Sequence, residues 1–524
     1  MNLIDDPWIP VHRRDGTREL IAPWQITDRV NPPTAVAANR PDFNAALLQF
    51  LVGLLQSTLR VDRATWDETL ENPPSPQALQ EKFEAVKPAF KLDGDGPKFM
   101  QDFESLEGDP QSVANLLIEQ PGDNTLRNNA DHFVKRAGAV RFCKPCLATA
   151  LMTLQVNAPA GGKGHRTSIR GGGPLTTLVD IDVSGQTNTT LFDRLWFNVL
   201  PAEIATDLDL LPCADLSRVF PWMSRTATSE PNQGRPITPE DVSGLQCFWA
   251  TPRRIQLLWE EVDDGTCSLC QGKGEVLSTY LTRAYGNNYE GAWLHPLSPY
   301  RASKDGQPTC VHPGPEGFSY RHWCSWVFGD QYVSAARVVS EAMSFVPRSI
   351  QLRLNCFGYD MDNMKARGWH ELRFPIYHVD ERDIPEVSAV IHQFIQAATH
   401  AARNLHKACK TAGAALAQTI TADASQRLYQ KTEAVFFSTV QELIASRKVE
   451  RGTSADTARR QLAEVWIRTL RATAFNIFDE ALSRIDIGFA NLEKLIPAKK
   501  QLVKELHPDR FHKIMTVNAE EELV

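Results

Sequence analysis

The residues best suited to chemistry in this sequence are two pairs of cysteines. Cys143 and Cys146 form the first pair, and Cys267 and Cys270 form the second pair far downstream. A gap of two residues lets both sulfurs of a pair reach one tetrahedral ion at ~2.3 Å, so the two pairs predict a four-thiolate site for a structural Zn²⁺. Such a site has no open position for water, which favours a structural role over catalysis. The alternative interpretation is four unrelated thiols.

A glycine-rich segment follows the first pair and has the composition of a phosphate-facing loop. The glycine loop (residues 157–174) reads NAPAGGKGHRTSIRGGGP and carries three basic side chains, Lys163, Arg166 and Arg170. Glycine amides without side chains, together with fixed positive charge, allow close approach to a phosphate backbone. The loop lacks GxxxxGK[ST], and no GxGxxG follows a strand, so it is not a nucleotide-binding loop of either kind. A flexible surface turn is the alternative.

No constellation typical of a catalytic site accompanies these motifs. His295, in WLHPLSP, and His370, in WHELRF, lie among aromatic residues and prolines without an acid at a recognisable spacing. An isolated histidine is more often structural than catalytic. The sequence therefore indicates a binding protein and not an enzyme. The alternatives are a zinc-dependent hydrolase acting on a nucleic acid or a small molecule, and a purely architectural scaffold.

Length and composition indicate a globular protein of two or three domains. Of 524 residues, 23% are charged and 42% are hydrophobic, which excludes wholesale disorder. The net charge of −7 argues against a generic, charge-driven nucleic-acid binder, although it allows a local basic patch. The sequence has no apolar run of about 18 residues, and its start, MNLIDDPWIPV, lacks the pattern of a signal peptide. We therefore expect a cytoplasmic protein without membrane association.

The elements that must position the motifs follow from periodicity. We expect an α+β fold, with a large mixed α/β domain over 1–384 and a four-helix bundle over 385–524. In the first domain a buried helix over 42–59, a helix over 147–156 and a strand over 175–183 are predicted, the last two on either side of the glycine loop. Residues 120–140 are polar and are interpreted as a long exposed loop. The predicted bundle helices cover 386–410, 424–447, 456–484 and 489–506.

Six segments occur in an order that resembles a known protein family. They are NLIDDPWIPV, CKPC, APAGGKGHRTSIRGGGPLTT, CSLC, GAWLHPLSPY and GYDMDNMKARGW, and with the helical end they cover nearly the whole chain. This succession resembles the CasA family, the large subunit of the type I-E CRISPR surveillance complex Cascade. The resemblance implies a subunit without catalytic activity. It would recognise the motif that flanks the target (the PAM) in double-stranded DNA, help to open the duplex and recruit the helicase–nuclease.

The resemblance also implies partners and contact residues. The partners are the other Cascade subunits, the 5′ handle of the CRISPR guide RNA, the target duplex and the helicase–nuclease. The family loop that enters the minor groove of the flanking motif matches Ala160, Gly161, Gly162, Lys163 and Gly164. Because a minor groove distinguishes mainly A·T from G·C pairs, such a loop would read the motif tolerantly.

Three further positions are implied by the same resemblance. The family carries a wedge at the tip of a hairpin, which matches Asp362, Asn363 and Met364. A basic residue that reads the flanking motif matches Arg283. An aromatic residue that anchors the subunit to the guide handle and its binding protein matches Phe133.

Overall fold

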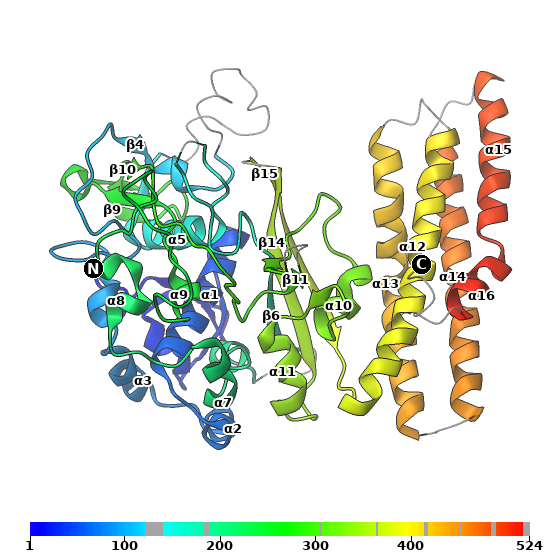
Figure 1. The fold of residues 1–524 in the computed structure, drawn as a ribbon, viewed down its shortest axis with the longest axis horizontal. Coiled ribbons are helices and arrows are strands. Elements are labelled where there is room, and N and C mark those ends of the chain that lie inside the picture. The colour runs from blue at the N-terminus through cyan, green and yellow to red at the C-terminus, as the bar shows by residue number, and fades with distance from the viewer. Residues whose placement is uncertain are drawn as a thin grey trace. The chain divides into compact units, whose positions relative to one another are not determined.

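The computed structural model describes residues 1–120, 140–162, 164–182, 188–302, 306–362, 365–412, 418–449, 453–483 and 489–516. By its internal contacts the chain divides into two compact units, whose elements are labelled in Figure 1. Unit 1 comprises Met1–Pro315 and Tyr332–Arg373, and unit 2 comprises Glu316–Gln331 and Phe374–Val524. The predicted boundary after residue 384 rests on composition, whereas this division rests on contacts and adds residues 316–331 and 374–384 to the helical part. The α+β fold class with a helical C-terminal region is confirmed.

A buried helix lies at the centre of unit 1. Helix α1 (Pro41–Thr58) begins with a proline at its first position, where the missing N–H costs no hydrogen bond. Phe50 in this helix is fully buried and is met edge-on by the rings of Trp8, Phe90, Phe99 and Trp249. Aromatic pairs prefer this edge-to-face arrangement. The helix therefore gathers segments that are up to about 240 residues apart in the chain into one core.

The strands of unit 1 form several small antiparallel sheets. The first has β1 (Ile9–Arg13) between β2 (Arg18–Ile21) and β3 (Pro33–Val36). The second has β10 (Thr279–Arg283) between β4 (Gln111–Ser112) and β7 (Arg254–Leu257). The third has β11 (Tyr300–Ala302) between β12 (Pro308–Cys310) and β13 (Val333–Ser334).

Two further sheets hold the motifs singled out in the sequence. In one, β9 (Lys273–Leu277) lies between β5 (Phe142–Cys143) and β8 (Asp263–Thr266). In the other, β14 (Leu352–Asp362) lies between β15 (Lys365–Ile376) and β6 (Thr176–Ile181). Strand β6 follows the glycine loop, as predicted, and all six of its residues are buried.

The remaining helices of unit 1 are shorter than α1. Helix α5 (Lys144–Asn157) leads into the glycine loop, as the predicted helix over 147–156 did, but it begins three residues earlier, directly after Cys143. The others are α2 (Arg63–Glu71), α3 (Pro76–Phe83), α6 (Leu191–Trp196), α7 (Ala202–Ala205), α8 (Leu216–Val219), α9 (Gln246–Trp249) and α11 (Arg337–Phe345).

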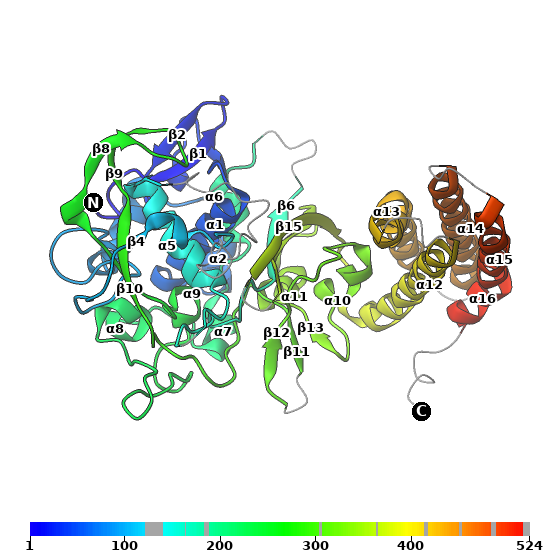
Figure 2. The same ribbon diagram turned by 90° about the horizontal axis from the view of Figure 1, so that it is seen from above.

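Unit 2 is built from long helices, which Figure 2 shows nearly end-on. They are α12 (Ile384–Ala412), α13 (Gln418–Val449), α14 (Thr453–Ser483) and α15 (Phe489–Glu505), close to the predicted ranges. A short helix α10 (Trp323–Val327) and a helix that was not predicted, α16 (Pro508–Thr516), complete the unit. Among the described residues no helix combines the length and the apolar character that crossing a membrane requires.

The core of unit 2 is aromatic and contains a few satisfied polar groups. The ring of Tyr320 stacks on that of Phe436 with centroids 4.2 Å apart, and its hydroxyl forms a hydrogen bond of 2.8 Å with the hydroxyl of Thr432. The Nε1–H of Trp466 donates to the carbonyl of Phe394 at 2.9 Å. Buried polar groups with partners avoid the cost of desolvation and fix how the helices pack.

Candidate functional site

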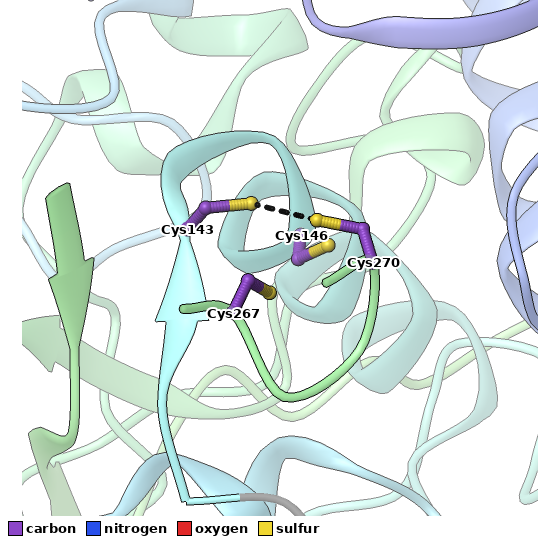
Figure 3. Close-up of side chains that lie close together, drawn as sticks. All are labelled: Cys143, Cys146, Cys267 and Cys270. Carbon is purple, nitrogen blue, oxygen red and sulfur yellow. Dashed lines mark hydrogen bonds between the residues drawn. The ribbon is translucent and has the colours of Figure 1, made fainter. Parts of the chain in front are cut away.

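The four cysteines of the two pairs lie together, with their side chains directed at one another (Figure 3). Their sulfur atoms all lie within 4.8 Å of one another, and Sγ of Cys143 is 3.6 Å from Sγ of Cys270. Four sulfurs around a tetrahedral ion with bonds of ~2.3 Å would be about 3.8 Å apart. The prediction that the two pairs meet is confirmed, and the donor set fits a four-thiolate Zn²⁺ site.

A three-stranded sheet brings the two pairs together. Cys143 ends β5 and caps α5, and Cys146 lies in the first turn of that helix. Cys267 follows β8 directly, and Cys270 lies in the turn that leads to β9. Because β9 pairs with both β5 and β8, it places the ends of those strands side by side. The sheet thus supplies the fixed geometry that a tetrahedral site needs.

The second pair lies in a tight turn and receives hydrogen bonds from the first pair. The N–H of Cys267 donates to the carbonyl of Gly272 at 2.8 Å, and the N–H of Gly272 is directed at Sγ of Cys270, 3.4 Å away. Hydrogen bonds from the thiols of Cys143 and Cys146, together with this N–H, lower the pKa of Cys270 to about 6, and the contacts with the second pair raise the pKa of Cys143 and Cys146. A thiolate is the form that binds a metal.

Helix α5 connects the cysteine cluster to the glycine loop. The helix begins at the cluster and ends at Asn157, whose carbonyl accepts a hydrogen bond from the N–H of Gly173 at 3.1 Å. The next carbonyl, of Ala158, accepts from the N–H of Ser168 at 2.9 Å. These bonds use carbonyl groups that a helix end leaves without partners. The glycine loop therefore leaves the end of α5 and returns to it.

The tip of the glycine loop is a tight, exposed turn. The N–H of Gly161 donates to the carbonyl of His165, and the N–H of His165 donates to the carbonyl of Gly162, both at 3.2 Å. Gly162 and Gly164 have φ of +83° and +78°, the left-handed region that favours glycine. Ala160, Gly161 and Gly162 are exposed, and Lys163 lies outside the described residues.

One side of this turn contacts the segment that carries Arg283. The N–H of Tyr285 donates to the carbonyl of Gly164 at 2.7 Å. A Cβ atom on Gly164 would lie 2.9 Å from the Tyr285 ring, so a side chain there would collide with it. Arg283 is exposed at the end of β10, two residues before Tyr285. Arg283 therefore belongs to the segment that supports the glycine loop.

The other end of the glycine loop contacts the hairpin of β14 and β15. A Cβ atom on Gly173 would lie 2.7 Å from both Cβ and the carbonyl oxygen of Tyr359. A Cβ atom on Gly358 would lie 2.6 Å from the carbonyl oxygen of Pro174. Strand β14 then continues to Asp362, which is exposed. The last residues of the loop are therefore packed against the part of β14 that leads to the hairpin tip. Asn363 and Met364 lie outside the described residues, as does Phe133.

Of the three basic residues of the loop, Arg170 is not available to a phosphate, contrary to the interpretation from composition. Its guanidinium is buried and donates to side-chain oxygens of Gln49, Ser298 and Thr176, at 2.5, 2.8 and 3.1 Å. Burial lowers its pKa. Arg166 is also engaged, because its Nε–H donates to Oγ of Ser229 at 2.8 Å. Arg170 therefore ties the end of the loop to α1.

Of the two histidines singled out in the sequence, His295 has a structural contact. His295 is buried, and its Nδ1 accepts a hydrogen bond from the N–H of Leu297 at 3.1 Å. Desolvation lowers the pKa of His295 well below its ordinary value, so the ring is held neutral. For His370 burial also lowers the pKa.

Sequence reasoning missed the residues that support the loop from below. The loop is contacted by Arg253 and Tyr285, and Arg253 is held by Gln155. None of these residues belongs to a motif. Arg253 and Tyr285 are about 90 to 120 residues away from their contacts in the chain. The adjacent arginines in PRRIQL were the only signal, and nothing in the sequence pointed from them to the loop.

Comparison with known proteins shows the family of this chain. The model of the CRISPR-associated protein Cse1 family matches residues 2–477. Cse1 of Thermobifida fusca is 18% identical, with a TM-score of 0.67 over 98% of this chain and 98% of that chain. CasA of Thermus thermophilus is 16% identical, with a TM-score of 0.66 over 97% and 99%. A chain of a CRISPR RNA-guided surveillance complex is also 16% identical, with a TM-score of 0.64 over 96% and 99%. These structures share the fold, and the match of the family model over most of the sequence shows that the chain belongs to the CRISPR-associated Cse1, or CasA, family.

Proposed function

We propose that this protein is the subunit of an RNA-guided CRISPR complex that recognises the motif flanking the target in double-stranded DNA. The observation that carries the proposal is the contact between Gly173 and Tyr359. It packs the end of the glycine loop against β14, three residues before that strand ends at Asp362. Reading a motif and separating the adjacent base pairs require two elements at a fixed spacing, and this contact would provide it.

The glycine loop is the reading element in this proposal. Ala160, Gly161 and Gly162 are exposed and carry almost no side chain, so their backbone can enter a minor groove about 6 Å wide. Lys163 and Arg283 would add positive charge that phosphates on either side of the groove attract. Gly164 would keep the turn closed against Tyr285. Such contacts tolerate several related motifs.

The hairpin tip is the opening element. In this proposal the tip would comprise Asp362, Asn363 and Met364, with Met364 as an apolar wedge and Asn363 bonded to a base edge. Inserting an apolar side chain between base steps costs a few kcal/mol of unstacking. Pairing between the guide RNA and the target strand would offset this cost.

The four cysteines would hold a structural Zn²⁺. When bound, the ion would cross-link the start of α5 to the turn between β8 and β9, and it would leave no coordination position for a substrate. The protein itself would therefore carry out no chemistry. It would act with the other Cascade subunits, the guide handle (contacted through Phe133) and a recruited helicase–nuclease.

The test is a gel shift of the reconstituted complex on duplexes that differ only in the base pairs beside the target. We expect the affinity to change with the flanking base pairs, and we expect a complex without this subunit to lose that dependence. Equal affinity for all flanking sequences would contradict the proposal and favour an architectural scaffold. Chelator-sensitive cleavage of DNA by the purified protein would instead favour the hydrolase alternative.

A further inference from the structure

Arg253 lies directly beneath the exposed turn of the glycine loop. This residue immediately precedes β7, and its Nη2–H donates to the carbonyl of Pro159 in a short hydrogen bond. A Cβ atom on Gly161 would lie only 2.3 Å from Nη1 of Arg253. The guanidinium therefore occupies the space under Gly161, and a side chain on Gly161 would also meet Cβ of His165, 2.6 Å away.

The backbone of Arg253 is fixed by the helix that leads into the loop. The side chain of Gln155 in α5 accepts from the N–H of Arg253 at 3.0 Å and donates to its carbonyl at 2.9 Å. Gln155 is 1% exposed, so this paired contact is shielded from water. The position of the guanidinium is therefore set by α5, as is the position of the loop that covers it.

The positive charge of Arg253 has no balancing carboxylate. Within the part of the chain that the structure describes, Arg253 forms no ion pair, and its Nε–H is buried without a hydrogen-bond partner. Its neighbour Arg254 shows the contrast, because it forms an ion pair of 2.5 Å with Asp102. Desolvation lowers the pKa of Arg253 to about 10, and burial and the charge of Arg253 lower the pKa of His165 in the loop.

Arg253 is half-buried, and a cation that is partly removed from water is less stable without an anion than with one. The exposed face of the loop above it is made of Ala160, Gly161 and Gly162, which offer no bulk to keep a phosphate away. A phosphate seated on those residues would be close enough to the guanidinium to gain from its field in a poorly screened environment. The arrangement therefore has the features of an anion site in which the positive charge comes from Arg253, on the other side of the loop.

We propose that Arg253 is a positioning residue and a cation of the glycine loop, which holds the loop through the Pro159 carbonyl and provides positive charge for one DNA phosphate above Gly161. This inference rests on the proposed function, because it takes the duplex beside the target as the source of the phosphate. It adds a residue that reaches the loop from another part of the chain.

The salt dependence of binding tests the charge. Each neutralised phosphate of B-DNA contributes about −0.9 to the slope of log K against log salt. We expect Arg253→Gln in the reconstituted complex to weaken duplex binding and to reduce that slope by about 0.9, whereas Arg253→Lys should keep the slope. The matched control is Arg63→Gln on α2, a half-buried arginine that pairs with Asp67 at 3.6 Å and donates to the carbonyl of Ser344. It removes the same charge and should change neither quantity.

Binding by Arg253→Gln that equals wild type, or that weakens with an unchanged slope, would overturn the inference. If Arg253→Gln fails to assemble, Gly161→Ala in the wild type and in Arg253→Lys tests the contact instead. The added methyl should weaken binding less when the guanidinium is absent, and additive effects would overturn the inference. Binding of the wild-type complex to duplexes with altered flanking base pairs distinguishes failure of this inference from failure of the proposed function. If the wild type binds all flanking sequences equally, the proposed function fails. If the wild type distinguishes the flanking sequences and Arg253→Gln binds DNA as the wild type does, only this inference fails.

Discussion

Gly173 lies so close to Tyr359 that a single methyl group would not fit between them, since a Cβ atom on Gly173 would be 2.7 Å from Cβ of the tyrosine. Tyr359 is anchored in turn, because its hydroxyl donates to Oδ2 of Asp42 at 2.7 Å. Asp42 lies in the first turn of α1 and forms an ion pair of 2.9 Å with Arg40. The end of the glycine loop, the hairpin and the central helix are thus joined in one chain of contacts.

This contact makes Gly173 sensitive to substitution. Gly173 has φ of +62°, so Gly173→Ala should cost about 1–2 kcal/mol for its left-handed backbone and a further ~1–3 kcal/mol for overpacking against Tyr359. The control is Gly94→Ala, where φ is +85° and no atom lies within 4 Å of the added Cβ. Denaturant unfolding should show the larger loss for Gly173→Ala, and its complex should bind target DNA more weakly. Equal losses for the two variants would contradict the contact.

The cysteine cluster predicts one metal ion per chain. Cys143→Ser combined with Cys267→Ser should abolish zinc binding in elemental analysis, because one thiolate is lost from each pair. The free energy of unfolding should fall by roughly 3 kcal/mol or more, since metal binding to a structural site contributes directly to folding. Cys213→Ser is the control, because Cys213 is half-buried and outside the cluster. A wild-type protein that is stable and free of metal would refute the zinc site.

A reversal of charge at the glycine loop should weaken target binding. Lys163→Glu replaces attraction with repulsion toward DNA phosphates, and we expect the assembled complex to lose about tenfold or more in affinity, with the loss largest at low salt. Lys82→Glu, at an exposed position of α3, makes the same change of charge away from the loop. A gel shift at two salt concentrations measures both variants. Equal effects of the two would mean that total charge, and not the loop, controls binding.

The hairpin tip should matter only when the duplex has to be opened. Asn363→Ala combined with Met364→Ala removes the wedge, so binding to a fully paired target should weaken by about tenfold, or ~1.4 kcal/mol. A target whose first base pairs beside the flanking motif are already mismatched carries no such cost, and the variant should bind it as the wild type does. Comparable losses on the paired and the pre-opened target would argue against a wedge.

Local pattern was sufficient to predict the long helices and the meeting of the cysteines. The helices of unit 2 follow apolar spacing, which depends only on near neighbours in the chain. Cys143 and Cys267 could be brought together by reasoning because four thiols fit one tetrahedral ion, which restricts the geometry strongly. The short helix α16 was not predicted, because its few apolar positions directly follow His507 and Pro508 at the end of α15.

Composition did not show which partner each charged side chain contacts. Arg166, Arg170 and Arg253 have the same side chain, yet one binds Ser229, one is buried against α1 and one lies under Gly161. Those differences come from contacts between residues about 60 to 130 positions apart. They depend on how α5 and β7 pack, which no local pattern encodes.

Helix α5 spans 14 residues, or about 21 Å, with the cysteine cluster at its first turn and the glycine loop at its last. A helix of this kind transmits strain in both directions, so loss of the ion at its first turn would make the position of the glycine turn at its end less well defined. Thermodynamic linkage makes the effect mutual. Target DNA bound by the loop should slow the dissociation of zinc. A chelator should therefore remove the ion faster from the free complex than from the complex bound to its target.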